Sequence, residues 1–362
     1  MQNEDYLNPD INEPIPAADK PKRRVSAGWL WVHGLLFVIG FGLLIWLVYS
    51  YWGQVRESVL NVGWGFAVVV TLNLIRHFGR ALSMYRAVAP EHRNFKYRSA
   101  VLARFGGEAV NFFTFTGPFL GDATKAMLLR RNTPITQSAS AVIIDNILYY
   151  ITVILVVIAG VGLLIMNYGS SSPTMSRILL AIVVVALILI SGLFVAMMKR
   201  SEPFSHIIGF LDRRGWAPGF ITRKWDGIRD VEKNVFQFYH DRKSDFFLVF
   251  AISLTVHMVS VAEVYCVLIF LGEHASVSNA FIIESLTKVI NAVFSFIPGT
   301  IGVYEGGNGL ILRTLKYGTG VGVALALVRR AAILFSTAIG CIVLIWRTAE
   351  GGAKRLKKDR DD

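Results

Sequence analysis

The feature that most constrains this chain is a series of long apolar segments that carry little charge. The first, residues 29–50, contains no Asp, Glu, Lys or Arg. A helix needs about 20 mostly apolar residues to cross the hydrocarbon core of a bilayer. Further segments of sufficient length lie at 60–85, 138–166, 177–198, 246–272 and 320–346. The sequence therefore predicts an all-α integral membrane protein with about six spanning helices.

Composition agrees with a membrane protein and excludes other classes. Hydrophobic residues make up 54% of the 362 residues, and charged residues only 17%. Cys266 and Cys341 both lie in apolar segments, so the chain is not a secreted domain held together by disulfides. The formal net charge is +12, but the basic residues lie between apolar segments and form no continuous face. We therefore expect no nucleic-acid partner.

The distribution of Lys and Arg predicts the orientation of the chain. These residues are concentrated near the amino terminus, after the second and fourth apolar segments, and at the carboxyl terminus. The alternate connections hold few or none, as 51–59, 166–176 and 272–280 illustrate. Cytoplasmic connections are rich in Lys and Arg. We therefore expect a multi-pass protein of the cell inner membrane with both termini in the cytoplasm.

The polar regions flank or interrupt one transmembrane domain, predicted at 29–347. Residues 1–28 and the basic tail 348–362 are predicted to be disordered in the cytoplasm. In the cytoplasmic loop 200–244, apolar residues such as Trp225 recur at near-helical spacing with basic residues between them. This pattern predicts an amphipathic helix, which lies either on the anionic inner leaflet or on the helical bundle. The loop and the basic tail are also candidate docking sites for a cytoplasmic or membrane partner.

Two further apolar stretches, 99–130 and 279–315, are interrupted by Gly and Pro. Most of the resulting pieces are too short to span a bilayer, so each stretch is predicted to form a re-entrant helical hairpin. With an offset of 180 residues, Asn111 falls on Asn291, and Pro118 likewise matches another proline. The aligned positions with exchanged charges are the pairs Arg104–Glu108 and Glu284–Lys288. Because three predicted spans separate the two stretches, they would enter from opposite sides, as in the inverted repeats of many transporters.

Ionisable side chains inside the predicted membrane segments point to a protein interior or a wet cavity. Eleven are found there, and each charge at the bilayer centre costs about 2.5–3.5 kcal/mol. The eleven are Arg104, Glu108, Asp122, Lys125, Asp145, Glu263, Glu284, Lys288, Glu305, Arg329 and Arg330. For Arg104, Glu108, Glu284 and Lys288 we predict interior ion pairs that fix the packing of the hairpins, and Glu263 is assigned to core packing. Of the adjacent arginines, one is expected to face the interior as a phosphate ligand while the other reaches toward the membrane surface.

Motifs for other chemistry are absent from the sequence. It contains no Gly-rich phosphate loop followed by Lys-Ser/Thr, no His-Glu-x-x-His and no cysteine pair at metal spacing. We therefore predict no catalytic residues, no cofactor and no metal site. Because no ATP-binding motif is present, any transport is expected to be passive or coupled to an ion.

The broken stretches resemble the flippase-like family named for the transmembrane region of lysylphosphatidylglycerol synthase, over most of 70–347. The resemblance rests on Asn111, Pro118, Gly121, Asp122 and Lys125 in the first half, and on Ile297-Pro298-Gly299-Thr300-Ile301-Gly302-Val303-Tyr304-Glu305 and Arg329 in the second. The second motif is similar to the family pattern Pro-Gly-Gly-x-Gly-x-x-Glu. The chain departs from the family at Asp145-Asn146, where Glu-Arg is frequent. Only a short tail follows the last predicted span, so lysyl transfer to lipid is not expected.

The resemblance implies movement of a lipid between leaflets, here of an anionic or glycosylated lipid. The half-helix amino termini near Gly121 and Gly302 would face the anionic headgroup. The residues expected at the headgroup site are Asn111, Pro118, Gly121, Asp122, Lys125, Asn291, Pro298, Gly299, Gly302, Glu305 and Arg329. Two alternatives remain open at this point. In the first alternative, the protein is an intramembrane lipid-modifying transferase. In the second, it is a non-catalytic membrane scaffold for a cytoplasmic enzyme.

Overall fold

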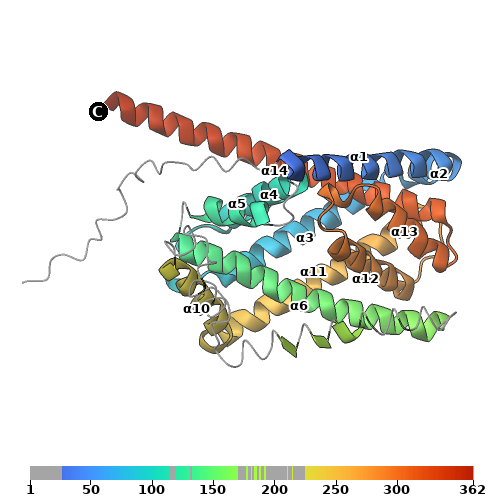
Figure 1. Ribbon diagram of the computed structural model, residues 1–362, viewed down its shortest axis with the longest axis horizontal. Coiled ribbons are helices and arrows are strands. Elements are labelled where there is room, and N and C mark those ends of the chain that lie inside the picture. The colour runs from blue at the N-terminus through green and yellow to red at the C-terminus, as the bar shows by residue number, and fades with distance from the viewer. Residues whose placement is uncertain are drawn as a thin grey trace, which may run out of the picture.

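The computed structural model describes residues 27–114, 119–130, 133–169 and 225–361, with isolated positions between 177 and 214. The elements of these ranges are helices, as the sequence predicts (Figure 1). The predicted fourth span, 177–198, lies largely outside the described residues, as do residues 1–26 and most of 200–224.

The first half of the chain contains α1 (Ala27–Ser50), α2 (Trp52–Val62), α3 (Gly65–Ala87), the short 3₁₀ helix η2 (Pro90–His92), α4 (Tyr97–Phe113), α5 (Phe119–Leu129) and α6 (Ile135–Tyr168). The second half contains α10 (Trp225–Asp241), α11 (Lys243–Phe270), α12 (Val277–Val293), the 3₁₀ turn η3 (Pro298–Thr300), α13 (Val303–Thr314) and α14 (Thr319–Asp361).

Within the described ranges, three helices are long and apolar enough to cross a membrane: α6, α11 and the Thr319–Glu350 part of α14. The helices α2 and α3 form a fourth candidate, which is bent by 80° at a short break. Together with the apolar composition, these helices identify a membrane protein. The sequence-based count of six spans stays a prediction.

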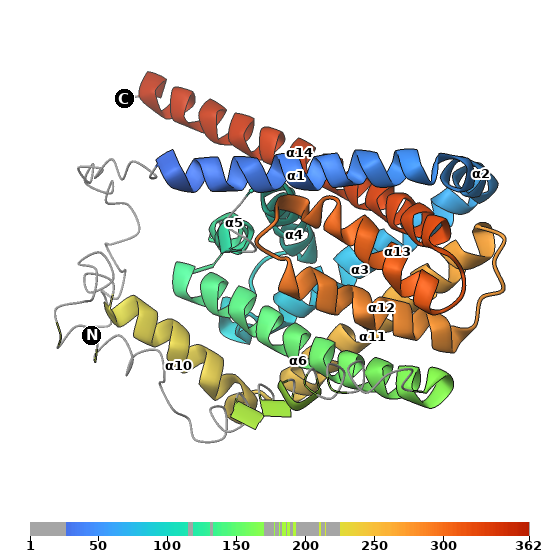
Figure 2. The ribbon, with the colours of Figure 1, turned by 45° about the vertical axis from the view of Figure 1, so that its right-hand side comes forward.

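The helices enclose two apolar cores. One core lies among α6, α11, α12 and α14 and contains the fully buried Leu268, Ile283 and Leu325. The other lies among α3, α4, α6 and α10 and contains Met84 and Leu148. Burial of these side chains holds the long helices together, and the two broken segments are packed between them (Figure 2).

Each broken segment forms a pair of short helices. The pair α4–α5 is closely packed because Gly107 and Gly121 face the opposite helix with no side chain between them. The pair α12–α13 is separated by residues 294–302, which include the turn η3. Gly299 and Gly302 have φ angles of 56° and 79° in this turn, a region that glycine enters without steric cost. The Gly-rich motif therefore breaks the helix as the sequence predicts.

The two pairs enter the bundle from opposite ends. The start of α4 follows the connection 88–96, where Arg93 lies 2.9 Å from Asp245 at the start of α11. The start of α12 lies at the other end, where the Tyr168 hydroxyl at the end of α6 donates to Asn279 over 2.9 Å. This arrangement agrees with an inverted repeat, which remains a prediction.

The two polar regions of the second half adopt defined positions. In α10, Val235, Phe236 and Phe238 are buried against the bundle in the second core. Of the two arrangements expected for the amphipathic helix, the structure has the one packed on the bundle. For 348–362, where the sequence predicts disorder, the structure continues α14 as a helix to Asp361. Residues 353–358, Ala-Lys-Arg-Leu-Lys-Lys, are all strong helix formers, which explains this continuation.

Candidate functional site

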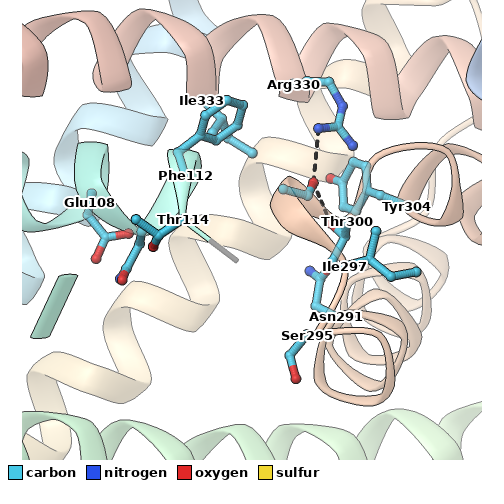
Figure 3. A pocket seen from close by; sticks show the side chains of 12 residues that line it. Glu108, Phe112, Thr114, Asn291, Ser295, Ile297, Thr300, Tyr304, Arg330 and Ile333 are labelled. Atoms are coloured by element: carbon cyan, nitrogen blue, oxygen red, sulfur yellow. Dashed lines mark hydrogen bonds between the residues drawn. The ribbon is translucent and has the colours of Figure 1, made fainter. Parts of the chain in front are cut away.

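A cavity of about 360 Å³ lies between the end of α4 and the break that separates α12 from α13 (Figure 3). One wall comes from the end of α4, another from the end of α12 and the turn that follows, and the third from α14. The lining residues are Glu108, Asn111, Phe112, Thr114, Asn291, Ser295, Ile297, Gly299, Thr300, Tyr304, Arg330 and Ile333. The cavity thus combines amide, hydroxyl and charged groups with apolar side chains, a composition typical of sites for amphipathic ligands.

Three of the residues predicted at the headgroup site line this cavity: Asn111, Asn291 and Gly299. The two asparagines are the ones that the internal alignment pairs, and they lie on different walls (Figure 3 labels Asn291). Asn111 also holds the first turn of α5, because its Oδ1 accepts a hydrogen bond of 3.0 Å from the Gly121 amide. Gly121 therefore does not line the cavity itself, but its amide holds the side chain of Asn111, which does. Pro118 lies outside the described residues, and Pro298 is the first residue of the turn η3.

Arg330 lies on the α14 wall and is held by two partners. Its Nε donates to Glu305 Oε1, and its Nη1 donates to the Gly299 carbonyl over 3.0 Å. Glu305 is completely buried and also accepts a hydrogen bond of 2.8 Å from the Gly302 amide. The carboxylate thus caps the first turn of α13 and orients Arg330. Glu305 is behind the cavity wall, and Arg330 is at the cavity.

Arg329, one of the residues predicted at the headgroup site, is buried away from the cavity lining. Its Nε lies 3.0 Å from Glu263 and its Nη2 lies 2.9 Å from Glu284. Lys288 contacts the same Glu284 at 2.7 Å, and Arg76 of α3 contacts Glu263 at 2.6 Å. These five side chains join α3, α11, α12 and α14 by charge-assisted contacts.

A second group of charges lies beside the cavity, around Glu108. Its Oε1 contacts Arg104 at 3.1 Å and Lys125 at 2.7 Å. Lys125 also lies 2.9 Å from Asp122, and Asp122 accepts a hydrogen bond of 2.7 Å from Asn146 of α6. Asp122 and Lys125 therefore stabilise the packing of α4, α5 and α6, and Glu108 is the member that reaches the cavity.

The comparison with family models gives one match over residues 31–340: the lysylphosphatidylglycerol synthase TM region. The chain belongs to this family. Members of the lysylphosphatidylglycerol synthase TM region family are membrane proteins of lipid metabolism or transport. The matched range contains both broken helix pairs and every residue that lines the cavity. Comparisons with curated proteins and with solved structures give no significant match.

Sequence reasoning missed two basic residues that help to organise this member of the family. Arg76 and Arg80 lie four residues apart within the apolar α3, and the spacing of one helical turn is the signal that could have found them. Arg80 lies 2.8 Å from Asp145 and donates to Asn146 over 2.9 Å. A guanidinium is therefore present beside Asp145, although the chain lacks the arginine that the family frequently carries at position 146.

The amino termini of the half-helices have internal partners. The Gly302 amide is bonded to Glu305 and the Gly121 amide to Asn111. These two backbone amides, which the sequence predicts to meet an anionic headgroup, are therefore already hydrogen-bonded within the protein. Among the described residues that line the cavity, Arg330 carries the positive charge. Within the described ranges, no group of three or more His, Cys, Asp or Glu side chains is arranged to hold a metal ion.

Proposed function

We propose that this protein moves a lipid with a phosphate-bearing headgroup between the two leaflets of the cell inner membrane. The observation that carries the proposal is a cavity lined both by the end of α4 and by the break between α12 and α13. Broken helices that meet at a polar site are typical of transporters, because their unwound backbone lines a pathway for polar groups. Membership in a family of lipid-associated membrane proteins supports the same conclusion.

In this proposal the headgroup leaves the bilayer surface and enters the cavity while its acyl chains stay in the lipid. Arg330 binds the phosphate, because a guanidinium presents several donors to phosphate oxygens and keeps its charge. Glu305 and Gly299 hold Arg330 in place, so little side-chain freedom is lost on binding. Asn111, Asn291 and neighbouring hydroxyl groups replace the water that the headgroup loses.

The proposal includes the orientation in the membrane and the energy source that the sequence predicts. Both termini and α10 lie on the cytoplasmic side, according to the distribution of Lys and Arg. Since the chain carries no ATP-binding motif, movement of the lipid is passive or coupled to an ion. Anionic and glycosylated phospholipids both contain the phosphate that Arg330 is proposed to bind. The basic tail and α10 remain candidate contacts for a partner.

The decisive test is lipid movement in sealed proteoliposomes, with headgroup-labelled phospholipids whose transfer between leaflets is followed in time. We expect Arg330→Gln to slow transfer about tenfold or more, the equivalent of one lost charge-assisted hydrogen bond. Arg313→Gln is the matched control, because Arg313 is exposed in the last turn of α13 and does not line the cavity. Its transfer rate should equal that of the wild type.

A second variant separates function from folding. Arg330→Gln leaves Glu305 buried without its cationic partner, whereas Asn291 is exposed in the cavity wall and its replacement threatens no buried pair. Asn291→Leu should therefore keep the wild-type melting temperature and still slow transfer. If wild-type vesicles transfer all phospholipids at the rate of empty vesicles, or if both variants match the wild type, the proposal is wrong.

A further inference from the structure

The cavity has charges of opposite sign on opposite walls. Among its described lining residues, the charged side chains are Glu108 on the α4 wall and Arg330 on the α14 wall. Figure 3 shows them on opposite sides of the space, with Asn291, Ser295 and Thr300 below Arg330 on its side. A ligand that fills the space therefore meets an acceptor at one end and a cation at the other.

Arg330 retains donors that face a ligand. A guanidinium has five N–H groups, and the contacts to Glu305 and Gly299 use one on Nε and one on Nη1. The side chain is 11% exposed. This wall suits a group with several oxygen acceptors, such as a phosphate diester.

Glu108 retains acceptor sites in the same way. Its side chain is 27% exposed, and Arg104 and Lys125 both contact the same oxygen, Oε1. An ionised carboxylate offers about four lone-pair sites over two oxygens. Arg104 and Lys125 also have Asp145 and Asp122 as partners, so neither cation is paired with Glu108 alone. The α4 wall therefore suits a donor that carries positive charge.

We propose that the preferred ligand of this cavity is a zwitterionic aminophospholipid headgroup, with its phosphate at Arg330 and its primary ammonium at Glu108. This inference rests on the proposed function and names the substrate class of the same site. An anionic headgroup whose far end carries only hydroxyl groups makes a neutral-donor bond to Glu108, and charge-assisted bonds are about twice as strong. A quaternary ammonium, as in phosphatidylcholine, has no N–H group and cannot donate a hydrogen bond to Glu108. The apolar Phe112, Ile297 and Ile333 suit a headgroup that is still attached to its lipid.

Binding to the full-length protein in detergent tests the inference without requiring transport. Native mass spectrometry would count bound phosphatidylethanolamine, phosphatidylglycerol and phosphatidylcholine of identical acyl chains, in competition. We expect phosphatidylethanolamine to bind about tenfold more tightly than either competitor, as one charge-assisted hydrogen bond implies. Glu108→Gln should abolish this preference, and Arg330→Gln should weaken binding of all three lipids to a similar extent. Soluble glycerophosphoethanolamine should compete only at far higher concentration than the lipid.

The control is Asp122→Asn, which also removes a partner of Lys125 but lies outside the cavity lining. It should keep the preference for phosphatidylethanolamine. Equal or tighter binding of phosphatidylglycerol by the wild type would overturn the inference, as would a preference that survives in Glu108→Gln. Binding of the soluble headgroup as tight as that of the lipid would also overturn it. Because binding is measured without transfer, a protein that selects phosphatidylethanolamine but moves no lipid would contradict the proposed function alone.

Discussion

At the scale of single residues, the buried charges hold the bundle together. Glu263 is 1% exposed and contacts both Arg76 and Arg329. Removing one partner of a buried ion pair costs about 3–5 kcal/mol, since the remaining charge stays desolvated. We therefore expect Glu263→Gln to lower the free energy of unfolding by about this amount, measured by denaturant titration in detergent.

The control at this scale is Glu57→Gln, since Glu57 is exposed on α2. This substitution should change the free energy of unfolding by no more than about 0.5 kcal/mol. An unfolding curve of Glu263→Gln that superimposes on the wild-type curve would show that the ion pairs contribute no stability. The sequence alone assigned Glu263 to core packing, because its partner Arg76 is 187 residues away and only the folded chain brings the two together.

At the scale of helices, the α4–α5 pair depends on the absence of a side chain at Gly121. A Cβ atom there would overlap the Asn111 side chain and the Gly107 carbonyl. Gly121→Ala should therefore push α5 away from α4 and destabilise the protein by about 1–3 kcal/mol. The melting temperature should fall, and ligand binding in the cavity should weaken because Asn111 is displaced from the wall.

Gly162 of α6 gives a matched comparison, because a Cβ atom added there meets nothing within 4 Å. Gly162→Ala should be neutral or should stabilise the protein by up to about 1 kcal/mol, as alanine favours a helix over glycine. Equal melting temperatures for Gly121→Ala and Gly162→Ala would contradict the close packing of α4 against α5.

The helices themselves could largely be predicted from the sequence, whereas the contacts between them could not. Apolar length predicts α6, α11 and α14, and the Gly-Pro motif predicts the break between α12 and α13, because both signals are local. The choice between Arg329 and Arg330 is different. The two residues are adjacent, and the packing of α14 against α11, α12 and α13 decides which one reaches the cavity.

At the scale of the whole molecule, the two ends of the bundle differ in their content of Lys and Arg. The end that contains the connection 88–96 and the start of α11 carries Arg93, Lys96 and Arg242. At the opposite end, the Tyr317 hydroxyl donates to the His274 carbonyl and ties the connection 271–276 to the turn between α13 and α14. Because Lys and Arg are retained in the cytoplasm during insertion, the first end should be cytoplasmic and the second external.

Single cysteines test this orientation, and with it the opposite entry of the two helix pairs. In a Cys266→Ala, Cys341→Ala background, Asn94→Cys and His274→Cys each place one thiol at an exposed position on opposite ends. A membrane-impermeant maleimide should label Asn94→Cys in inside-out vesicles alone and His274→Cys in right-side-out vesicles alone. Labelling of both thiols from one side would contradict the inverted repeat, since α4 and α12 would then enter the membrane from the same face. Reversed labelling would keep the repeat and overturn the cytoplasmic position of α10 and the termini.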